Sequence, residues 1–273
     1  MIETIKLAVI AAAGQGTRMW PASKVVPKEL FPIGKLPVIA HVVAEMIDAG
    51  LNQVVVVSAA HNSGFMKELF DPSKPPPLKI ARDPVVARFQ EAISNCSIEV
   101  IEQNAGYGNG TPLRSAVERF GVQPCIYAFG DDVVIGENVT KGLLGIYERT
   151  GHAVMGAQEV PPALTSSFGI LECEARHGEN FVRRVIEKPA QGETLSNLAS
   201  FGRYLVTRPV IERLRDVSAG RDGEIWFIDA VLAHLHEGGE VCAFRPTAGK
   251  WYTVGNPRSY ADAVYAEAAE QQL

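Results

Sequence analysis

The stretch Leu7-Ala8-Val9-Ile10-Ala11-Ala12-Ala13-Gly14-Gln15-Gly16-Thr17-Arg18-Met19 decides how this chain of 273 residues is interpreted. Its first part is a continuous apolar run, and a glycine ends the run. A short apolar run that stops at a glycine is typical of a parallel strand buried on both faces. We therefore predict a strand over residues 7–13, with the Gly-rich segment just beyond its carboxyl end.

Strand and helix patterns alternate through the first 160 residues. The further predicted strands are 54–57, 98–102, 125–129 and 153–160, and the predicted helices are 37–48, 63–70, 84–93, 113–119 and 143–149. Such alternation predicts an α/β fold of Rossmann-like type, with a mostly parallel sheet that helices cover on both faces. Ligands of these sheets bind beyond the carboxyl ends of the strands.

Beyond residue 160 the rhythm changes. Strand-like segments occur at 169–173, 182–186 and 199–206, and helical patterns occur near 209–214, 226–235 and 259–271. The sequence contains no Ser/Gly-rich or charged linker between the two parts. We therefore predict a single domain over residues 1–273, with residues 1–160 and 161–273 as its two halves.

Charge and composition exclude several classes of protein. The chain has 26 Lys and Arg against 31 Asp and Glu, a net charge of −5 at pH 7, which argues against a nucleic-acid-binding protein. No apolar run approaches the roughly 18 residues of a membrane span, and the first residues lack a signal-peptide pattern. We expect a cytoplasmic protein without nucleic-acid or membrane partners. Its four cysteines lack a C-x-x-C pair, so we expect buried, reduced thiols.

The loop after the first predicted strand, residues 14–36, is far longer than the usual connection of about two to six residues. Its glycines let backbone N–H groups approach a phosphate chain, and Arg18 and Lys28 add positive charge, so a triphosphate is the expected ligand. Met19 occupies the third glycine position of the dinucleotide motif G-x-G-x-x-G, and G-x-x-x-x-G-K-(S/T) is absent. An NAD-dependent dehydrogenase is therefore disfavoured.

The loop resembles the signature of the sugar-1-phosphate nucleotidyltransferases, G-x-G-T-R-(M/L)-x-P-x-(S/T)-K-x-x-P-K-E-x-x-P. The chain satisfies it through Gly14, Gly16, Thr17, Arg18, Met19, Pro21, Ser23, Lys24, Pro27, Lys28, Glu29 and Pro32. The resemblance covers nearly the whole chain and is greatest to the uridylyltransferases of the family. It implies the nucleotide-diphospho-sugar transferase type of fold and transfer of a uridylyl group from UTP to glucose 1-phosphate, with release of pyrophosphate. It also implies Mg²⁺ as cofactor, and we expect a homo-oligomer.

The resemblance implies roles for residues in the first half, the nucleotide-binding half. Arg18 and Lys28 would be catalytic, and the implied nucleotide contacts are Ala12, Ala13, Gly14, Gly16, Thr17 and Glu29. Residues 103–110 resemble the loop that reads the base, so Gln103 and Gly108 would hold the pyrimidine. In Phe129-Gly130-Asp131-Asp132, Asp131 would bind Mg²⁺, with Asp132 behind it or capping a helix.

The second half, 161–273, would bind the sugar phosphate. Gly169 would approach the sugar, Glu187 would accept its hydroxyls, Lys188 would pair with its phosphate, and Asn197 would lie against it. By the same resemblance, residues 223–230 are expected to be largely structural.

One position departs from the family pattern. Trp251-Tyr252-Thr253-Val254-Gly255 has a threonine where the family usually has a second aspartate for Mg²⁺. A hydroxyl is a weaker, neutral ligand, although one carboxylate and the substrate phosphates can suffice. Two alternatives follow: a dTTP-dependent thymidylyltransferase, because both bases present similar edges, and a nucleotide-sugar-binding regulator without turnover.

Overall fold

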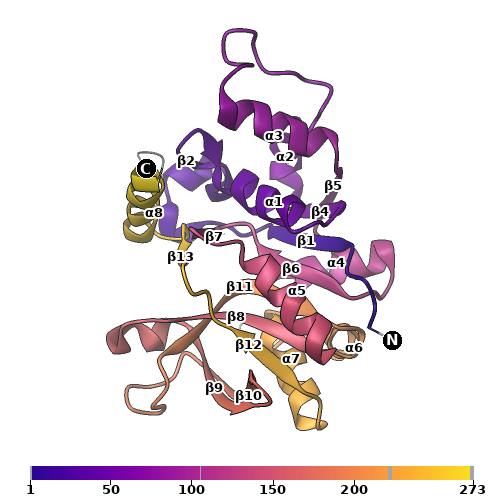
Figure 1. Ribbon diagram of the computed structural model, residues 1–273, viewed down its shortest axis with the longest axis vertical. Coiled ribbons are helices and arrows are strands. Elements are labelled where there is room, and N and C mark those ends of the chain that lie inside the picture. Colours follow the sequence, from indigo (N-terminus) through magenta and orange to yellow (C-terminus); the bar gives the residue numbers. More distant parts are fainter. Residues whose placement is uncertain (1, 105, 221–222, 271–273) are drawn as a thin grey trace.

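The computed structural model describes residues 2–104, 106–220 and 223–270, and Figure 1 shows its arrangement. The strands of its central sheet are β1 (Leu7–Ala12), β4 (Gln53–Ser58), β5 (Ser97–Glu102), β6 (Cys125–Phe129), β8 (Ala153–Glu159), β9 (Gly169–Arg176), β10 (Glu179–Glu187), β11 (Leu198–Val206) and β12 (Val241–Phe244). Two small sheets pair β2 (Pro32–Ile33) with β3 (Leu36–Pro37), and β7 (Asp132–Ile135) with β13 (Lys250–Thr253).

The helices are α1 (Val38–Asp48), α2 (Ser63–Leu69), α3 (Pro84–Ser94), α4 (Thr111–Phe120), α5 (Val139–Thr150), α6 (Arg208–Asp216), α7 (Phe227–His236) and α8 (Pro257–Glu270). The loop after β1 contains three short 3₁₀ turns, at Thr17–Met19, Ala22–Lys24 and Lys28–Leu30. In the part of the chain that the structure describes, no helix is both long and apolar enough to span a bilayer.

The central sheet has the order β5-β4-β1-β6-β11-β8-β12-β10-β9. Among the described residues, seven of its strands run in one direction, and β10 and β11 run in the other. The α/β fold with a mostly parallel sheet is thereby confirmed. Strand β11 from the second half of the chain lies between β6 and β8 from the first half, so both halves contribute to one sheet.

The predicted strands and helices are present with boundaries shifted by a few residues, and residue 271 of the predicted last helix lies outside the described residues. The sequence patterns do not predict β2, β3, β7, β12 or β13. The first two of these strands have two residues each and the other three have four, too few for periodicity to identify. Pro37, expected in the first turn of α1, lies just before it as the residue that caps the helix.

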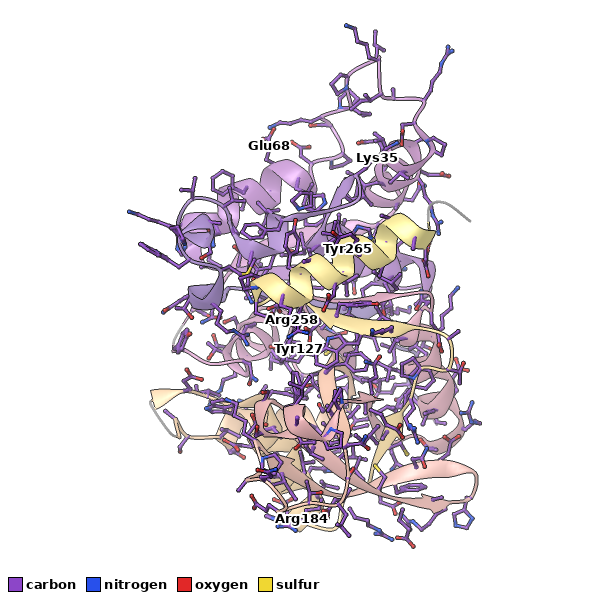
Figure 2. All side chains as sticks on the ribbon, turned by 90° about the vertical axis from the view of Figure 1, so that its left-hand side faces the viewer. Lys35, Glu68, Tyr127, Arg184, Arg258 and Tyr265 are labelled. Atoms are coloured by element: carbon purple, nitrogen blue, oxygen red, sulfur yellow. The ribbon has the colours of Figure 1, made fainter. Side chains whose placement is uncertain are left out.

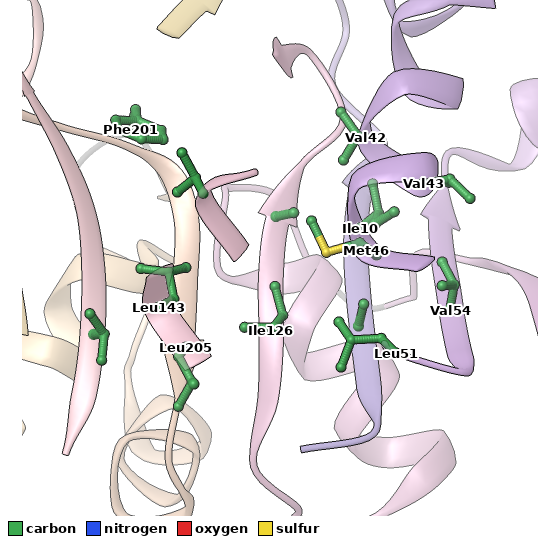
Figure 3. Close-up of a cluster of buried hydrophobic side chains, with 14 of the residues drawn as sticks. Ile10, Val42, Val43, Met46, Leu51, Val54, Ile126, Leu143, Phe201 and Leu205 are labelled. Carbon is green, nitrogen blue, oxygen red and sulfur yellow. The ribbon is translucent and has the colours of Figure 1, made fainter. Parts of the chain in front are cut away.

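Alternating side chains of the strands form two cores, one on each face of the sheet. Figure 3 shows Ile10 of β1, Val54 of β4 and Met46 of α1 in one cluster, all fully or nearly fully buried. Helix α5 covers the same face through Leu143. On the other face, Leu7 and the neighbouring strands pack against α4, α6 and α7. Helices therefore cover both faces, as the alternating pattern predicts.

Helix α8 lies outside the layers of the central sheet. It crosses the edge of the molecule near β7 and β13, and Figure 2 shows Arg258 and Tyr265 along it.

The expectation that all four cysteines are buried was wrong for Cys173, which is exposed on β9, and for Cys96, which is half-buried. Both lie in or beside strands at an edge of the sheet, where one face is less covered.

Candidate active site

The site begins where two neighbouring parallel strands end. Strand β1 leads into Ala13 and Gly14, and β6 leads into Gly130 and Asp131. The Gly130 N–H donates a hydrogen bond of 2.8 Å to the Ala11 carbonyl, which continues the pairing of β1 with β6 beyond β6. This contact places the carboxylate of Asp131 beside the Gly-rich loop.

Two adjoining cavities lie at this edge of the sheet. The first, of about 260 Å³, is lined by six predicted nucleotide-side residues, Ala13, Gly14, Lys28, Glu29, Gln103 and Gly108. The second, of about 500 Å³, is lined by the predicted Arg18, Gly169, Glu187 and Lys188. Both cavities share Asn109, Phe129, Asp131 and Trp226. The cavities therefore meet at Asp131, with nucleotide residues on one side and sugar-phosphate residues on the other.

Lys28, Glu29 and Asp131 form a nearly buried cluster of charges. The Lys28 ammonium forms an ion pair with Asp131, and its Nζ lies 3.7 Å from Glu29 Oε1. Burial lowers the pKa of Lys28, but attraction to Asp131 and Glu29 outweighs it and raises the pKa above its ordinary value. Burial also raises the pKa of Glu29 to about 7. Glu29 Oε2 is buried without a hydrogen-bond partner among the described residues, and Glu29 lines the nucleotide cavity.

A fully buried guanidinium lies behind Asp131. Arg203 on β11 is 0% exposed and pairs with Glu45 of α1, with Nη2 at 2.9 Å from Oε2 and Nε at 3.1 Å from the same oxygen. The backbone N–H of Thr140 donates to Glu45 Oε1 at 3.1 Å, and its hydroxyl donates to the same oxygen at 2.7 Å. The charge of Arg203 is thereby balanced inside the core.

Arg203 holds the backbone on both sides of Asp131. Its Nη2 donates to the Asp132 carbonyl at 2.8 Å, and its Nη1 donates to the Phe129 carbonyl at 3.4 Å. The Asp131 carbonyl accepts the N–H of Val254 at 2.8 Å. Burial raises the pKa of Asp132 to about 6, and the charge of Asp131 contributes to this increase. Three hydrogen bonds, two from Arg203 and one from Val254, thus hold the turn that carries Asp131.

The predicted base-reading loop packs directly against residues before α7. Gly108 has φ +116°, and a Cβ there would lie 2.3 Å from the Ile225 carbonyl oxygen, so only glycine fits. The Gln103 side chain donates to the Gly106 carbonyl at 3.0 Å, and its backbone N–H donates to the Ser58 carbonyl at 2.8 Å. Backbone amides and a side-chain amide are therefore placed at the rim of the first cavity.

Lys188 has an uncommon backbone conformation for a lysine. Its φ is +49°, in the left-handed region, and its N–H donates to the Phe168 carbonyl at 3.0 Å. Such conformations persist where surrounding structure requires them, and they cluster at functional sites. The Nζ lies 3.9 Å from Glu187 Oε1, and burial raises the pKa of Glu187 even though Lys188 opposes the shift. The second cavity therefore contains an ammonium and a carboxylate side by side.

Four other predicted residues are absent from the lining of both cavities. Ala12 is buried within β1, and Gly16 and Thr17 begin the first 3₁₀ turn, where the Ser23 hydroxyl donates to the Gly16 carbonyl at 2.7 Å. The Asn197 side chain donates to the Val160 carbonyl at 3.0 Å. This hydrogen bond uses one N–H of the Asn197 amide, and the predicted contact of Asn197 with the sugar stays a prediction.

The threonine that departs from the family pattern faces the same centre. A methyl group on Gly255 would lie 2.8 Å from Arg18 Nη2, 3.3 Å from Asp131 Oδ2 and 3.4 Å from Thr253 Oγ1. These three groups therefore surround one point, and glycine at 255 leaves room for them. Thr253 is also the cross-strand partner of Asp132 in the pairing of β13 with β7.

This donor set suits a divalent cation that substrate oxygens complete. Asp131 supplies a carboxylate that is 15% exposed, and Thr253 supplies a nearby hydroxyl. The described residues contain no group of three or more His, Cys, Asp or Glu side chains arranged to hold a metal ion. Mg²⁺ sites commonly combine one or two carboxylates with water and substrate phosphates, so the residues present fit that kind of ion.

The sequence did not reveal several residues that line the cavities. Trp226 and Glu224 belong to the segment expected to be structural, and Tyr107 and Asn109 flank the predicted Gly108. The segment Gly223-Glu224-Ile225-Trp226 combines a glycine that is typical of a turn with a large aromatic residue, and this combination could have indicated a site. The structure brings it there through Ile225, whose N–H donates to the Tyr107 carbonyl at 2.8 Å.

Comparison with known proteins identifies the family of this chain. A family model described as nucleotidyl transferase matches residues 7–270. UTP–glucose-1-phosphate uridylyltransferase of Staphylococcus haemolyticus is 34% identical over 235 residues, which cover 84% of this chain and 81% of that protein. UTP–glucose-1-phosphate uridylyltransferase 2 of Staphylococcus saprophyticus is 33% identical over 259 residues, which cover 93% and 89%.

Two solved structures have the same fold over nearly the whole chain. UDP-glucose pyrophosphorylase complexed with UDP-glucose superimposes with a TM-score of 0.87 at 26% identity, covering 98% of this chain and 100% of the other. The UTP-bound UGPase of Acinetobacter baumannii has a TM-score of 0.82 at 25% identity, covering 98% and 94%. From the signature, the two joined cavities and these matches together, the chain belongs to the nucleotidyl transferase family.

Proposed function

We propose that this enzyme transfers a uridylyl group from UTP to glucose 1-phosphate, forming UDP-glucose and pyrophosphate. The observation that carries the proposal is the position of Asp131 and Lys28 where the two cavities meet. A nucleotide in the first cavity and a sugar phosphate in the second would bring their phosphates to this point. The names of the relatives support UTP and glucose 1-phosphate as the pair.

The first half of the chain would bind UTP. Gln103 and Gly108 would hold the pyrimidine at the rim of the first cavity, and Glu29 would lie beside the nucleotide. The end of β1 and the start of the Gly-rich loop would offer their backbone to the nucleotide and its phosphates through Ala12, Ala13, Gly14, Gly16 and Thr17. Arg18 and Lys28 would offset the charge of the triphosphate from the two sides of Asp131.

The second half would bind glucose 1-phosphate. Lys188 would pair with the phosphate, Glu187 would accept sugar hydroxyls, and Gly169 would let the sugar approach the backbone. We also propose, from the resemblance to the family, that Asn197 lies against the sugar. The chain would then act as a single domain, with residues 1–160 for the nucleotide and 161–273 for the sugar phosphate.

The reaction needs positioning and positive charge more than acid–base chemistry. An oxygen of the sugar phosphate attacks the α-phosphorus of UTP, a new P–O bond forms, and the bond to the departing pyrophosphate oxygen breaks in line with it. Lys188 would orient the attacking phosphate, while Lys28 and Arg18 would stabilise charge on the transferred and leaving groups. Mg²⁺ held by Asp131 would add positive charge between the phosphates.

A nucleotide panel tests the proposal. Purified protein is incubated with glucose 1-phosphate, Mg²⁺ and each of UTP, dTTP, ATP, CTP and GTP, and pyrophosphate release is measured before and after chelation. We expect the highest kcat/KM with UTP and no turnover after chelation. Preference for dTTP would assign a thymidylyltransferase. Binding of UDP-glucose without any turnover would assign the regulator. Cytoplasmic location and a homo-oligomeric state stay predictions that this panel does not address.

A further inference from the structure

Trp226 lies at the boundary between the two cavities. Together with Asn109, Phe129 and Asp131 it lines both of them, and its side chain is half-buried. The next residue, Phe227, belongs to the hydrophobic core: it is 3% exposed and packs against Tyr204 with ring centroids 4.7 Å apart. The Trp226 ring instead faces the space where the substrates of the proposed reaction would meet.

The backbone that carries Trp226 is held by the base-reading loop. The Gly110 N–H donates to the Ile225 carbonyl at 2.8 Å, and the Phe227 N–H donates to Asn109 Oδ1 at 2.8 Å. The N–H of Ile225 donates to the Tyr107 carbonyl at the same distance. Three hydrogen bonds within residues 107–110 and 225–227 therefore tie the position of this ring to the loop predicted to hold the pyrimidine.

The Trp226 ring also contacts Lys188, the lysine that we propose binds the phosphate of the sugar. The Lys188 Nζ lies 5.1 Å from the centroid of the Trp226 ring, within the range of a cation–π interaction, for which tryptophan is the best aromatic partner. The Lys188 side chain is 55% exposed, and its carboxylate neighbour Glu187 is 3.9 Å away. A long, exposed lysine loses much rotamer freedom when it is ordered, so a ring that restrains it contributes to the position of the ammonium.

We propose that Trp226 is a positioning residue that sets acceptor recognition: its ring holds the Lys188 ammonium where it meets the phosphate of a hexose 1-phosphate, and it separates nucleoside from hexose. This inference rests on the proposed function of the site. The phosphate that Lys188 binds becomes the sugar-linked phosphate of the UDP-sugar product. Loss of the ring therefore weakens hexose 1-phosphate and UDP-glucose binding and leaves UTP binding nearly unchanged.

The test uses the full chain and the variants Trp226→Phe, Trp226→Leu and Lys188→Met, with Tyr265→Leu as control. Tyr265 on α8 is 78% exposed and lines neither cavity. Dissociation constants for UDP-glucose and UTP are measured by calorimetry, and KM for each substrate is measured by pyrophosphate release. For Trp226→Leu we expect about tenfold weaker UDP-glucose binding, which corresponds to ~1.4 kcal/mol, and less than twofold change for UTP. The dissociation constant of Trp226→Phe for UDP-glucose is expected to lie between those of wild type and Trp226→Leu, because a phenyl ring attracts a cation less strongly than an indole ring does.

A double-mutant cycle shows whether the ring acts through Lys188. If it does, Trp226→Leu adds little to the loss that Lys188→Met already causes in UDP-glucose binding. Fully additive losses would overturn the proposal, and so would equal weakening of UTP and UDP-glucose or unchanged binding in Trp226→Leu. If Trp226→Leu does not fold, Trp226→Phe carries the cycle. Absence of turnover in wild type would reject the proposed reaction. The dissociation constants measured by calorimetry do not depend on turnover, so they test the role of Trp226 separately.

Discussion

The ammonium group of Lys28 and the carboxylate of Asp131, 103 residues apart in the sequence, form an ion pair where the two cavities meet. Their side chains are 12% and 15% exposed, so water screens the pair only in part. The lysine thus neutralises the carboxylate that we propose as the metal ligand. Binding of substrate phosphates would draw the ammonium away and leave Asp131 to the metal.

Removal of the Lys28 charge should therefore separate metal binding from turnover. In Lys28→Met we expect tighter binding of Mn²⁺, used as a paramagnetic probe for Mg²⁺, in the absence of nucleotide, because the competing cation is gone. We expect kcat/KM to fall at least tenfold, the scale of losing one preorganised charge. Electron paramagnetic resonance measures free Mn²⁺, and Asp131→Asn is the control that should bind it more weakly. Unchanged Mn²⁺ affinity in Lys28→Met would contradict the competition.

The titration of Glu29 should appear in the pH dependence of stability. Burial raises its pKa to about 7 from an ordinary 4.5, so between these pH values the folded protein binds a proton that the unfolded chain releases. The contribution of Glu29 to stability is fully present below pH 4.5 and is lost as the pH rises to about 7. In Glu29→Gln this loss is absent, a difference of roughly 3 kcal/mol between pH 4.5 and pH 8.

Urea unfolding at several pH values measures that difference. The control is Glu68→Gln, which removes an exposed carboxylate on the surface (Figure 2) and should leave the pH slope as in wild type. Parallel pH profiles for wild type and Glu29→Gln would mean that the pKa of Glu29 is the same in the folded and the unfolded protein.

Thr253 provides a gain-of-function test of the metal site. Its hydroxyl and the Asp131 carboxylate surround the same point near Gly255, so Thr253→Asp adds a second carboxylate beside the first. We expect the Mg²⁺ concentration for half-maximal rate to fall severalfold, because added negative charge strengthens a hard-cation site. Thr253→Asn, of similar size without charge, is the matched control. An identical Mg²⁺ requirement in the two variants would show that position 253 does not reach the metal.

The buried pair of Arg203 and Glu45 should contribute strongly to stability. Arg203→Met leaves the Glu45 carboxylate, which is 10% exposed, without its charge partner, and it frees the carbonyls of Phe129 and Asp132. Breaking a buried pair typically costs about 3–5 kcal/mol, which urea unfolding at pH 7 would detect. Arg213→Met, which breaks a surface pair with Glu237, should change stability little. Equal effects of the two substitutions would contradict this account.

Local patterns in the sequence determined the main layers of the fold, and the family signature indicated the candidate site. A short apolar run such as residues 7–13, ended by a glycine, favours a strand buried on both faces, and the Gly-rich loop after such a strand lies at the carboxyl edge of the sheet. The prediction of Gln103, Asp131 and Lys188 as site residues rests on the resemblance to the family, and that of Lys28 rests also on its place in the loop; all four line the two cavities.

Only the tertiary structure decided which of these residues touch, and which others join them. The pair of Arg203 with Glu45 links positions 158 residues apart, and no local period encodes such a contact. Trp226 reaches both cavities because hydrogen bonds to residues 107–110 hold its backbone there. The strands β7 and β13 are too short to identify alone and form because they pair with each other. Contacts of this kind depend on how the whole chain packs, so the sequence specifies them but does not display them.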